Sequence, residues 1–168
     1  IEHAGHKILF DTGQSDSFLH NAKTLGIDLS QADAIVLSHG HYDHTGSLAK
    51  VLDFAQDAQV CMHTAAVEDK FSYSTGKCRY IGMPPEARQK LAHRHVLFAE
   101  KPTELFEGAF VTGTIPRANG FEDTGGAFFL DQSCELCDEI LDDQALYFMT
   151  GQGWVVLLGC GHAGVVNT

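Results

Sequence analysis

The chain has 168 residues, of which 44% are hydrophobic and 20% charged, and this composition fits one globular α/β or β-rich domain over residues 1–168. The formal net charge of −11 argues against a broad binding surface for nucleic acid or anionic membrane. No apolar run approaches the ~20 residues of a membrane span, so we expect neither nucleic acid nor a membrane among the partners.

Strand and helix patterns alternate through the first hundred residues. Helical spacing of apolar residues between polar caps and Gly26 predicts a helix over 15–26. Similar patterns predict strands over 7–10, 34–38, 58–63 and 95–100, and helices over 45–55 and 84–93. The irregular stretch 72–85 has no such pattern, and we expect a mobile loop near a site.

The remaining residues have mostly strand patterns. Apolar runs occur at 110–115, 126–130, 145–150 and 153–160, and "TGQG" at 150–153 predicts a hairpin between the last two. No linker separates this part from the first. We therefore expect two sheets in one layered domain with helices outside.

The five cysteines are odd in number and scattered, which indicates a reducing, cytoplasmic setting rather than a disulfide framework: Cys61, Cys78, Cys134, Cys137 and Cys160. Cys134 and Cys137 form a single CxxC without the second pair that a four-cysteine zinc site requires. We interpret this pair as a plain surface loop rather than a redox or metal motif.

The densest chemical signal is "HGHYDH" at 39–44, directly after a buried strand. In an extended loop, residues two apart project to the same side, so His39 and His41 are placed to bind one metal ion while Asp43 and His44 reach a second. Neutral imidazoles with a carboxylate suit divalent zinc first, with manganese, iron and nickel as alternatives. The competing interpretation is a polar loop whose histidines cap the next helix.

The His-x-His-x-Asp-His pattern after an apolar strand resembles the signature of the metallo-β-lactamase superfamily. This resemblance implies an αββα sandwich with the metal site at the sheet edges, here apparently truncated at both ends. It also implies that Asp11, which ends an earlier strand, supports the metal loop by fixing either a ligand histidine or the loop backbone, without touching metal.

A second match, "LLGCGHAGVVNT" at 157–168, places His162 after a strand and before a helix start, as a further metal ligand. With "GTIPR" at 113–117 it resembles the branch of 7,8-dihydropterin-6-ylmethyl-4-(β-D-ribofuranosyl)aminobenzene-5′-phosphate synthase-like proteins. That branch usually has Glu and Ser where this chain has Thr114 and Gly161. Its late Gly-Gly-Phe-His ligand motif is absent, so we expect that the sequence is a fragment or that the site is incomplete.

The resemblance supports three functional hypotheses. The first is a metal-dependent hydrolase of an ester or phosphoester, with one or two ions and with Asp43 also accepting a proton. The second is the transferase of the pterin-pathway branch, and the third is a non-catalytic metal-binding relative. The substrate is expected to be a small, phosphorylated or pterin-like molecule, whose anionic group Arg117 would bind through its planar fork.

Other candidates have plainer interpretations. His63, in "HTAA", is expected to be a structural histidine. His93 and His95, in "HRH", are expected to be surface residues. Asp142 and Asp143, in "LDDQ", are expected to form part of a turn. The triplet Asp-Thr-Gly occurs at 11–13 and 123–125, as in the two halves of an acid protease. Only the first follows a buried strand, so we interpret the second as a chance loop triplet.

Overall fold

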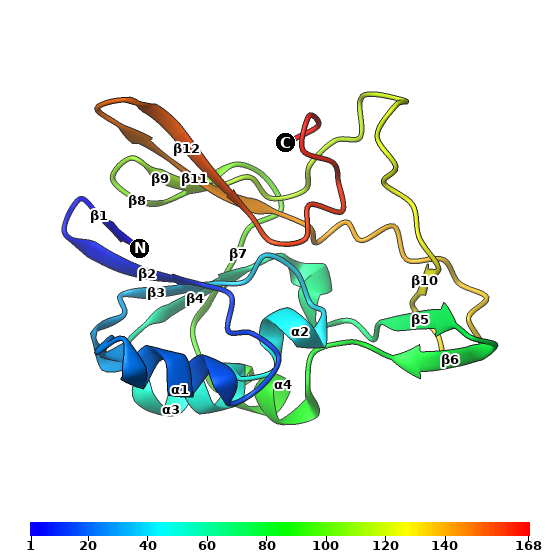
Figure 1. The fold of residues 1–168 in the computed structure, drawn as a ribbon, viewed down its shortest axis with the longest axis horizontal. Helices are drawn as coiled ribbons and strands as arrows, with labels where there is room; N and C mark the ends of the chain where they lie inside the picture. Colours follow the sequence, from blue (N-terminus) through cyan, green and yellow to red (C-terminus); the bar gives the residue numbers. More distant parts are fainter.

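The computed structural model describes residues 1–168, and the apolar runs of the first hundred residues form its first sheet (Figure 1). The strand order is β1-β2-β3-β4-β7, parallel except for the antiparallel pair β1-β2. These strands are β1 (Glu2–His3), β2 (His6–Phe10), β3 (Ala34–Val36), β4 (Gln59–Met62) and β7 (Val96–Phe98). Every residue of β3 is buried, because this central parallel strand is covered on both faces.

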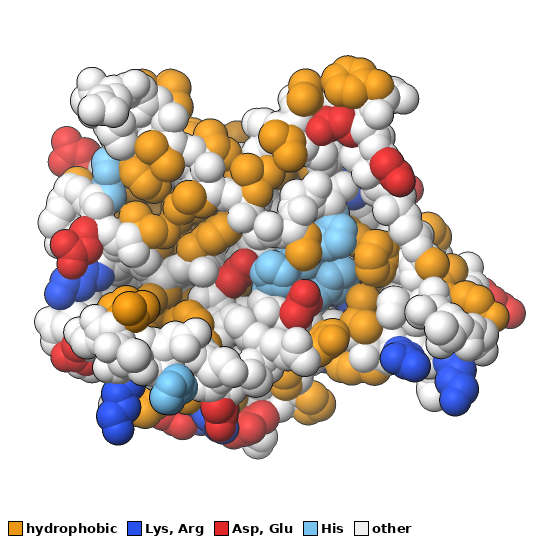
Figure 2. Space-filling view, in the orientation of Figure 1, with side chains coloured by type: hydrophobic (Ala, Val, Ile, Leu, Met, Phe, Trp, Pro, Cys, Tyr) orange, Lys and Arg blue, Asp and Glu red, His pale blue; other side chains and the backbone are white.

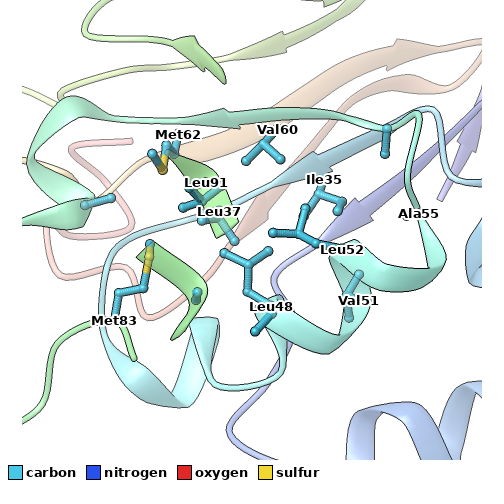
Figure 3. Close-up of a cluster of buried hydrophobic side chains, with 14 of the residues drawn as sticks. Ile35, Leu37, Leu48, Val51, Leu52, Ala55, Val60, Met62, Met83 and Leu91 are labelled. Carbon is cyan, nitrogen blue, oxygen red and sulfur yellow. The ribbon is translucent and has the colours of Figure 1, made fainter. Parts of the chain in front are cut away.

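Helices cover one face of this sheet (Figure 1). They are α1 (Ser17–Thr24), α2 (Tyr42–Thr45), α3 (Leu48–Phe54) and α4 (Pro85–Leu91), with short 3-10 turns η1 (Leu29–Gln31) and η2 (Thr64–Val67). Figure 3 shows Leu48 and Leu52 of α3 directed at Ile35 and Val60 of the sheet, with Met83 at the edge of the same cluster. This packing supplies the apolar burial that such short helices need.

A second, antiparallel sheet packs on the other face of the first, in the order β12-β11-β9-β8. Its strands are β8 (Thr103–Phe106), β9 (Ala109–Val111), β11 (Ala145–Thr150) and β12 (Gly153–Leu158). Between the sheets, Val36 and Cys61 share a core cluster with Val111 and Leu146. The expected pair of layered sheets is confirmed, and in residues 1–168 the helices lie on the first sheet only (Figure 1).

A small third sheet, β10-β5-β6, extends from one end of the molecule (Figure 1). It contains β5 (Phe71–Ser74), β6 (Lys77–Tyr80) and β10 (Phe128–Phe129). The prediction of a mobile loop over 72–85 was therefore wrong. Thr75 and Gly76 both have positive φ, at 53° and 76°, which is the backbone of a tight two-residue hairpin turn.

The other predicted elements are largely confirmed, with shifted ends. The helix expected at 45–55 begins at Leu48, because residues 42–45 form the separate helical turn α2. Turns rather than a helix follow His162, and β8 was not predicted. The hairpin at 150–153 is confirmed by pairing of Thr150 with Gly153. None of the helices has the length and apolar content needed to cross a membrane.

The cysteine prediction requires a correction. A disulfide joins Cys78 of β6 to Cys134, whereas we expected reduced cysteines and a plain loop around Cys134 and Cys137. The partner of Cys134 lies 56 residues away in the sequence, and spacing alone does not reveal such a pairing. Cys61, Cys137 and Cys160 are free, and only Cys61 is buried.

Candidate metal centre

The histidines predicted to bind metal meet where strands of the two main sheets end. His39 and His41 follow β3, His44 lies in the helical turn α2, and His162 follows β12. The side chains of His41 and His44 also stack edgewise or at an angle against His39. Figure 2 shows histidine surface gathered at the centre of one face, with acidic and hydrophobic side chains around it.

His39, His41 and His162 form the more buried group of donors. Nε2 of His39 lies 3.0 Å from Nδ1 of His41, and one ring nitrogen of each of the three histidines lies within 4.8 Å of the others. Zinc–nitrogen bonds of about 2.0–2.1 Å at tetrahedral angles would separate two nitrogens by about 3.3 Å, which is close to this spacing. Nε2 of His41 and Nε2 of His162 are buried without any hydrogen-bond partner.

The spacing of the donor nitrogens and the orphaned Nε2 of His162 indicate that the group fits a metal ion. A buried polar atom without a partner is costly, so its presence needs an explanation. Nδ1 of His41 faces Nε2 of His39, and the three imidazoles of the cluster provide the donor type that zinc and neighbouring divalent metals prefer. Phe128 packs against both rings, with centroid distances of 5.4 Å to His41 and 5.3 Å to His162, and covers one side of the cluster.

A second group of donors combines His39, His44 and Cys160. Nε2 of His44 lies 3.1 Å from Sγ of Cys160 and 3.6 Å from a carboxylate oxygen of Asp43. Cys160 was not among the residues predicted to bind metal. Its Cys-x-His spacing to His162 is the signal that would have indicated it.

The position of Asp43 differs from the expected extended loop. Asp43 and His44 lie on the helical turn α2, and the Asp43 side chain is 46% exposed. The carboxylate therefore reaches the rim of the cluster from the solvent side, rather than being enclosed with the histidines.

The charge states of the two groups differ. Burial, followed by the neighbouring His162, lowers the pKa of His41 to about 4, and burial with the nearby His41 and His44 lowers the pKa of His39 still further. These two rings are therefore neutral at pH 7, as ligands must be. Burial also opposes protonation of His44, but hydrogen bonds with Asp11 and Cys160 outweigh it and raise the pKa of His44 to about 10.

Cys160 has the opposite shift to His44. Hydrogen bonding to His162 and then to His44 lowers the pKa of Cys160 to about 7. Without metal, the contact between His44 and Cys160 therefore resembles an imidazolium–thiolate pair. A divalent ion that binds Nε2 of His44 must displace its proton, and the thiolate character of Cys160 favours such a cation.

Asp11 holds the second group in place. One carboxylate oxygen accepts a hydrogen bond from the backbone N–H of Ser38 at 2.7 Å. The other contacts both the Ser38 hydroxyl and Nδ1 of His44, each at 2.7 Å. Because a carboxylate accepts hydrogen bonds, Nδ1 of His44 carries the proton of the neutral ring, and Nε2 is left with the lone pair that a metal would use.

A buried ion-pair network supports the loop that carries His39 and His41. Asp142 accepts a hydrogen bond from the N–H of Gly40 at 2.7 Å and a second from Nζ of Lys70 at 2.8 Å. Lys70 is 1% exposed and also pairs with Asp138 at 3.0 Å. A Cβ at Gly40 would lie 2.2 Å from the carbonyl oxygen of Ala66, so only glycine allows this loop to pack so closely.

The residues after Asp142 continue the support. Asp143 accepts a hydrogen bond from the N–H of Ala163 at 2.7 Å, next to His162, and burial raises its pKa. Gln144 donates from its amide to the carbonyl of Leu37 at 2.8 Å. The predicted turn at 142–143 is present, but its two carboxylates are buried and hold both histidine-bearing loops, a role that sequence reasoning missed.

The remaining candidates lie apart from these contacts. Arg117 donates to the carbonyl oxygen of Glu139, and its Nε is buried without a partner. His63 bonds to the hydroxyl of Thr114 at 2.9 Å and to a backbone N–H, as expected of a structural histidine. The exposed residues are His93, His95 and Asp123, and Asp123 accepts only a local hydrogen bond from Gly125.

Comparison with known proteins agrees with this architecture. Residues 1–166 match the family model of the metallo-beta-lactamase superfamily. An uncharacterized protein of Methanocaldococcus jannaschii is 32% identical over 99% of this chain and 62% of its own length. From the same organism, 7,8-dihydropterin-6-methyl-4-(beta-D-ribofuranosyl)-aminobenzene-5'-phosphate synthase is 30% identical over 96% of this chain and 58% of its own length. The chain thus spans about three fifths of these curated relatives.

Solved structures show the same fold at low sequence identity. The metallo-beta-lactamase MIM-1 from Novosphingobium pentaromativorans aligns with a TM-score of 0.55 and 18% identity, over 94% of this chain and 53% of its own. A quorum-quenching N-acyl homoserine lactone lactonase aligns with a TM-score of 0.55 and 19% identity, over 92% of this chain and 56% of its own.

Proposed function

Since the chain belongs to the metallo-β-lactamase superfamily, we propose that it is a metal-dependent hydrolase of an ester or phosphoester. The observation that carries the proposal is the cluster of His39, His41 and His162, in which one ring nitrogen of each residue lies within 4.8 Å of the others. His44 and Cys160 would provide donors for a second ion, with Asp43 at the rim. Imidazole and thiolate donors favour zinc, bound as one or two ions.

The chain's own residues have distinct roles in this proposal. A bound divalent ion would supply Lewis acidity toward the ester or phosphoryl oxygen and a nucleophile at neutral pH. Asp11 holds the proton of His44 at Nδ1, and Phe128 excludes water from the side of His41 and His162. The exposed carboxylate of Asp43 accepts a proton during turnover.

The substrate is proposed to be a small anionic molecule. Arg117 is the candidate for its anionic group on the basis of its planar guanidinium fork alone. The net charge of −11 disfavours nucleic acid and anionic membrane as partners. We also propose a cytoplasmic location, in which the disulfide between Cys78 and Cys134 would be a transient bond.

The test is hydrolysis by protein reconstituted with zinc, assayed with nitrophenyl phosphodiester, phosphomonoester and carboxylate ester substrates. His41→Ala should lose both zinc and turnover, whereas His93→Ala, from the exposed His-x-His pair, should retain both. Stoichiometric zinc binding without turnover of any substrate class would instead support the non-catalytic metal-binding relative.

A second candidate function rests on the curated synthase that is 30% identical to this chain. The reaction would join a hydroxymethyl-dihydropterin pyrophosphate to a ribofuranosyl-aminobenzene phosphate and release pyrophosphate. Incubation of the zinc-loaded protein with both substrates should then give the coupled product and one pyrophosphate per coupling. Hydrolysis of a nitrophenyl ester with no coupled product would leave only the first candidate.

A further inference from the structure

Three cysteines lie together at the free end of the small third sheet. The disulfide between Cys78 and Cys134 connects β6 to the loop after β10, and Cys137 follows three residues later as a free, exposed thiol. Cys78 and Cys134 are both half-buried, so the disulfide lies near the surface. None of these three residues belongs to the metal centre.

The loop that carries two of the cysteines is tightly closed. The N–H of Leu130 bonds to the carbonyl of Leu136 at 2.8 Å. The carboxylate of Asp131 accepts hydrogen bonds from the backbone N–H groups of Glu135 and Leu136, at 3.0 and 2.7 Å. Cys137 then pairs with Phe129 in an antiparallel bridge. A compact turn therefore holds Cys134 and Cys137 in one CxxC segment.

The backbone at Cys134 adds a reason for the bond to rearrange. Its φ is 57°, in the left-handed region that residues with a side chain rarely adopt. Strain of this kind concentrates at functional sites. In the cytoplasmic location proposed above, on which this step rests, disulfides are usually transient and take part in exchange rather than serving as permanent crosslinks.

We propose that Cys78, Cys134 and Cys137 form a thiol–disulfide exchange site. The thiolate of Cys137 attacks Sγ of Cys134, so that a Cys134–Cys137 bond forms as the Cys134–Cys78 bond breaks. Cys78 leaves as a thiolate and takes up the proton that Cys137 released. The number of disulfides and of thiols is unchanged, so this step requires no external oxidant or reductant.

Exchange would release β6 from the loop after β10. The hairpin β5-β6 would then be held to this segment by the pairing of Phe71 and Ser72 with β10 and by the bond from the N–H of Tyr73 to the carbonyl of Ala127. The same strand carries Phe128, which covers the metal-binding histidines. The exchange site is thereby connected through one short strand to the metal centre.

The experiment follows the disulfide pairing in the oxidised full chain. Protein is incubated at mildly alkaline pH without added thiol, quenched with acid at intervals, and digested under non-reducing conditions with trypsin and a glutamate-specific protease. Cleavage after Glu135 separates Cys134 from Cys137, and cleavage after Lys77 and Arg79 isolates Cys78. Mass spectrometry then identifies which fragments remain linked.

The expected result is loss of the Cys78–Cys134 link with a matching gain of the Cys134–Cys137 link, at a rate independent of protein concentration. Cys137→Ser should abolish this change and retain the Cys78–Cys134 bond completely, which also shows that the variant is folded. Cys78→Ser, incubated with oxidised glutathione as the two-electron oxidant, should form the Cys134–Cys137 link and release two equivalents of glutathione. Absence of that link from both the wild-type protein and Cys78→Ser would overturn the proposal.

Discussion

Replacing Asp11 with asparagine should weaken metal binding although Asp11 itself is not a metal donor. The carboxylate accepts three hydrogen bonds, from the Ser38 N–H, the Ser38 hydroxyl and Nδ1 of His44. An amide has one accepting oxygen and one donating nitrogen in the same space. In either orientation of the new amide, its nitrogen would therefore face a group that donates in the wild-type protein.

In one orientation of the Asp11→Asn amide, its nitrogen faces Nδ1 of His44. His44 must then accept at Nδ1 and carry its proton on Nε2, the atom that faces Cys160. In the other orientation, the nitrogen faces the N–H of Ser38 and disturbs the backbone that leads into His39. Loss of such a supporting contact typically weakens metal affinity about 10–100-fold, which corresponds to about 1.4–2.7 kcal/mol.

Zinc affinity is measured by competition with a chromogenic chelator. Asp123→Asn is the matched control, because it changes the same Asp-Thr-Gly triplet at an exposed position without contact to the histidines. Its zinc affinity should equal that of the wild type. A zinc affinity of Asp11→Asn within about twofold of wild type, less than about 0.5 kcal/mol, would refute the reasoning.

Three further predictions concern stability. Lys70→Met should lower the free energy of unfolding by about 3–5 kcal/mol in urea titrations, because Asp138 and Asp142 lose their buried cation; an unchanged urea midpoint would contradict this. Burial opposes the charge on Lys70, but the aspartates outweigh it and raise its pKa above 10.5. The ion pairs therefore stabilise the fold fully below pH 10.5, and this contribution is lost as pH rises through the raised pKa of Lys70. The urea midpoint of the wild-type protein should fall more steeply at alkaline pH than that of Lys70→Met. Gly40→Ala should lower both the melting temperature and the zinc affinity, because its Cβ would meet the Ala66 carbonyl. Calorimetry with and without zinc checks this. A zinc-induced increase in the melting temperature of Gly40→Ala as large as that of the wild-type protein would contradict the prediction.

The sequence predicted the elements whose apolar pattern is regular and missed those that depend on distant partners. The run "AIVLS" identified a buried strand, and the histidines that follow it do converge. The hairpin at Thr75 and Gly76 was missed because Thr is an unusual residue for a turn with positive φ. Its strands are also mostly exposed, so their apolar pattern is weak.

The supporting residues of the site were harder to predict than its donors. Asp142 and Asp143 were expected to lie in an ordinary turn rather than to form a carboxylate pair, because adjacent residues on a strand point to opposite faces. In the structure each carboxylate supports a different loop, at Gly40 and at Ala163, so adjacency did not argue against a role. Lys70 gave no signal, since nothing local indicates that a lysine will be buried between two aspartates.

The hydrogen bond that Asp142 accepts from the N–H of Gly40 also affects the order of folding and metal binding. These residues are separated by 102 positions, and Gln144 and Leu37 by 107. Contacts with such separation form late because their loop closure costs entropy before any contact compensates for it. During synthesis, the histidine segment leaves the ribosome well before the residues that hold it in place. Metal acquisition should therefore follow the folding of β11, and the emerging chain presents the same histidines without a rigid site.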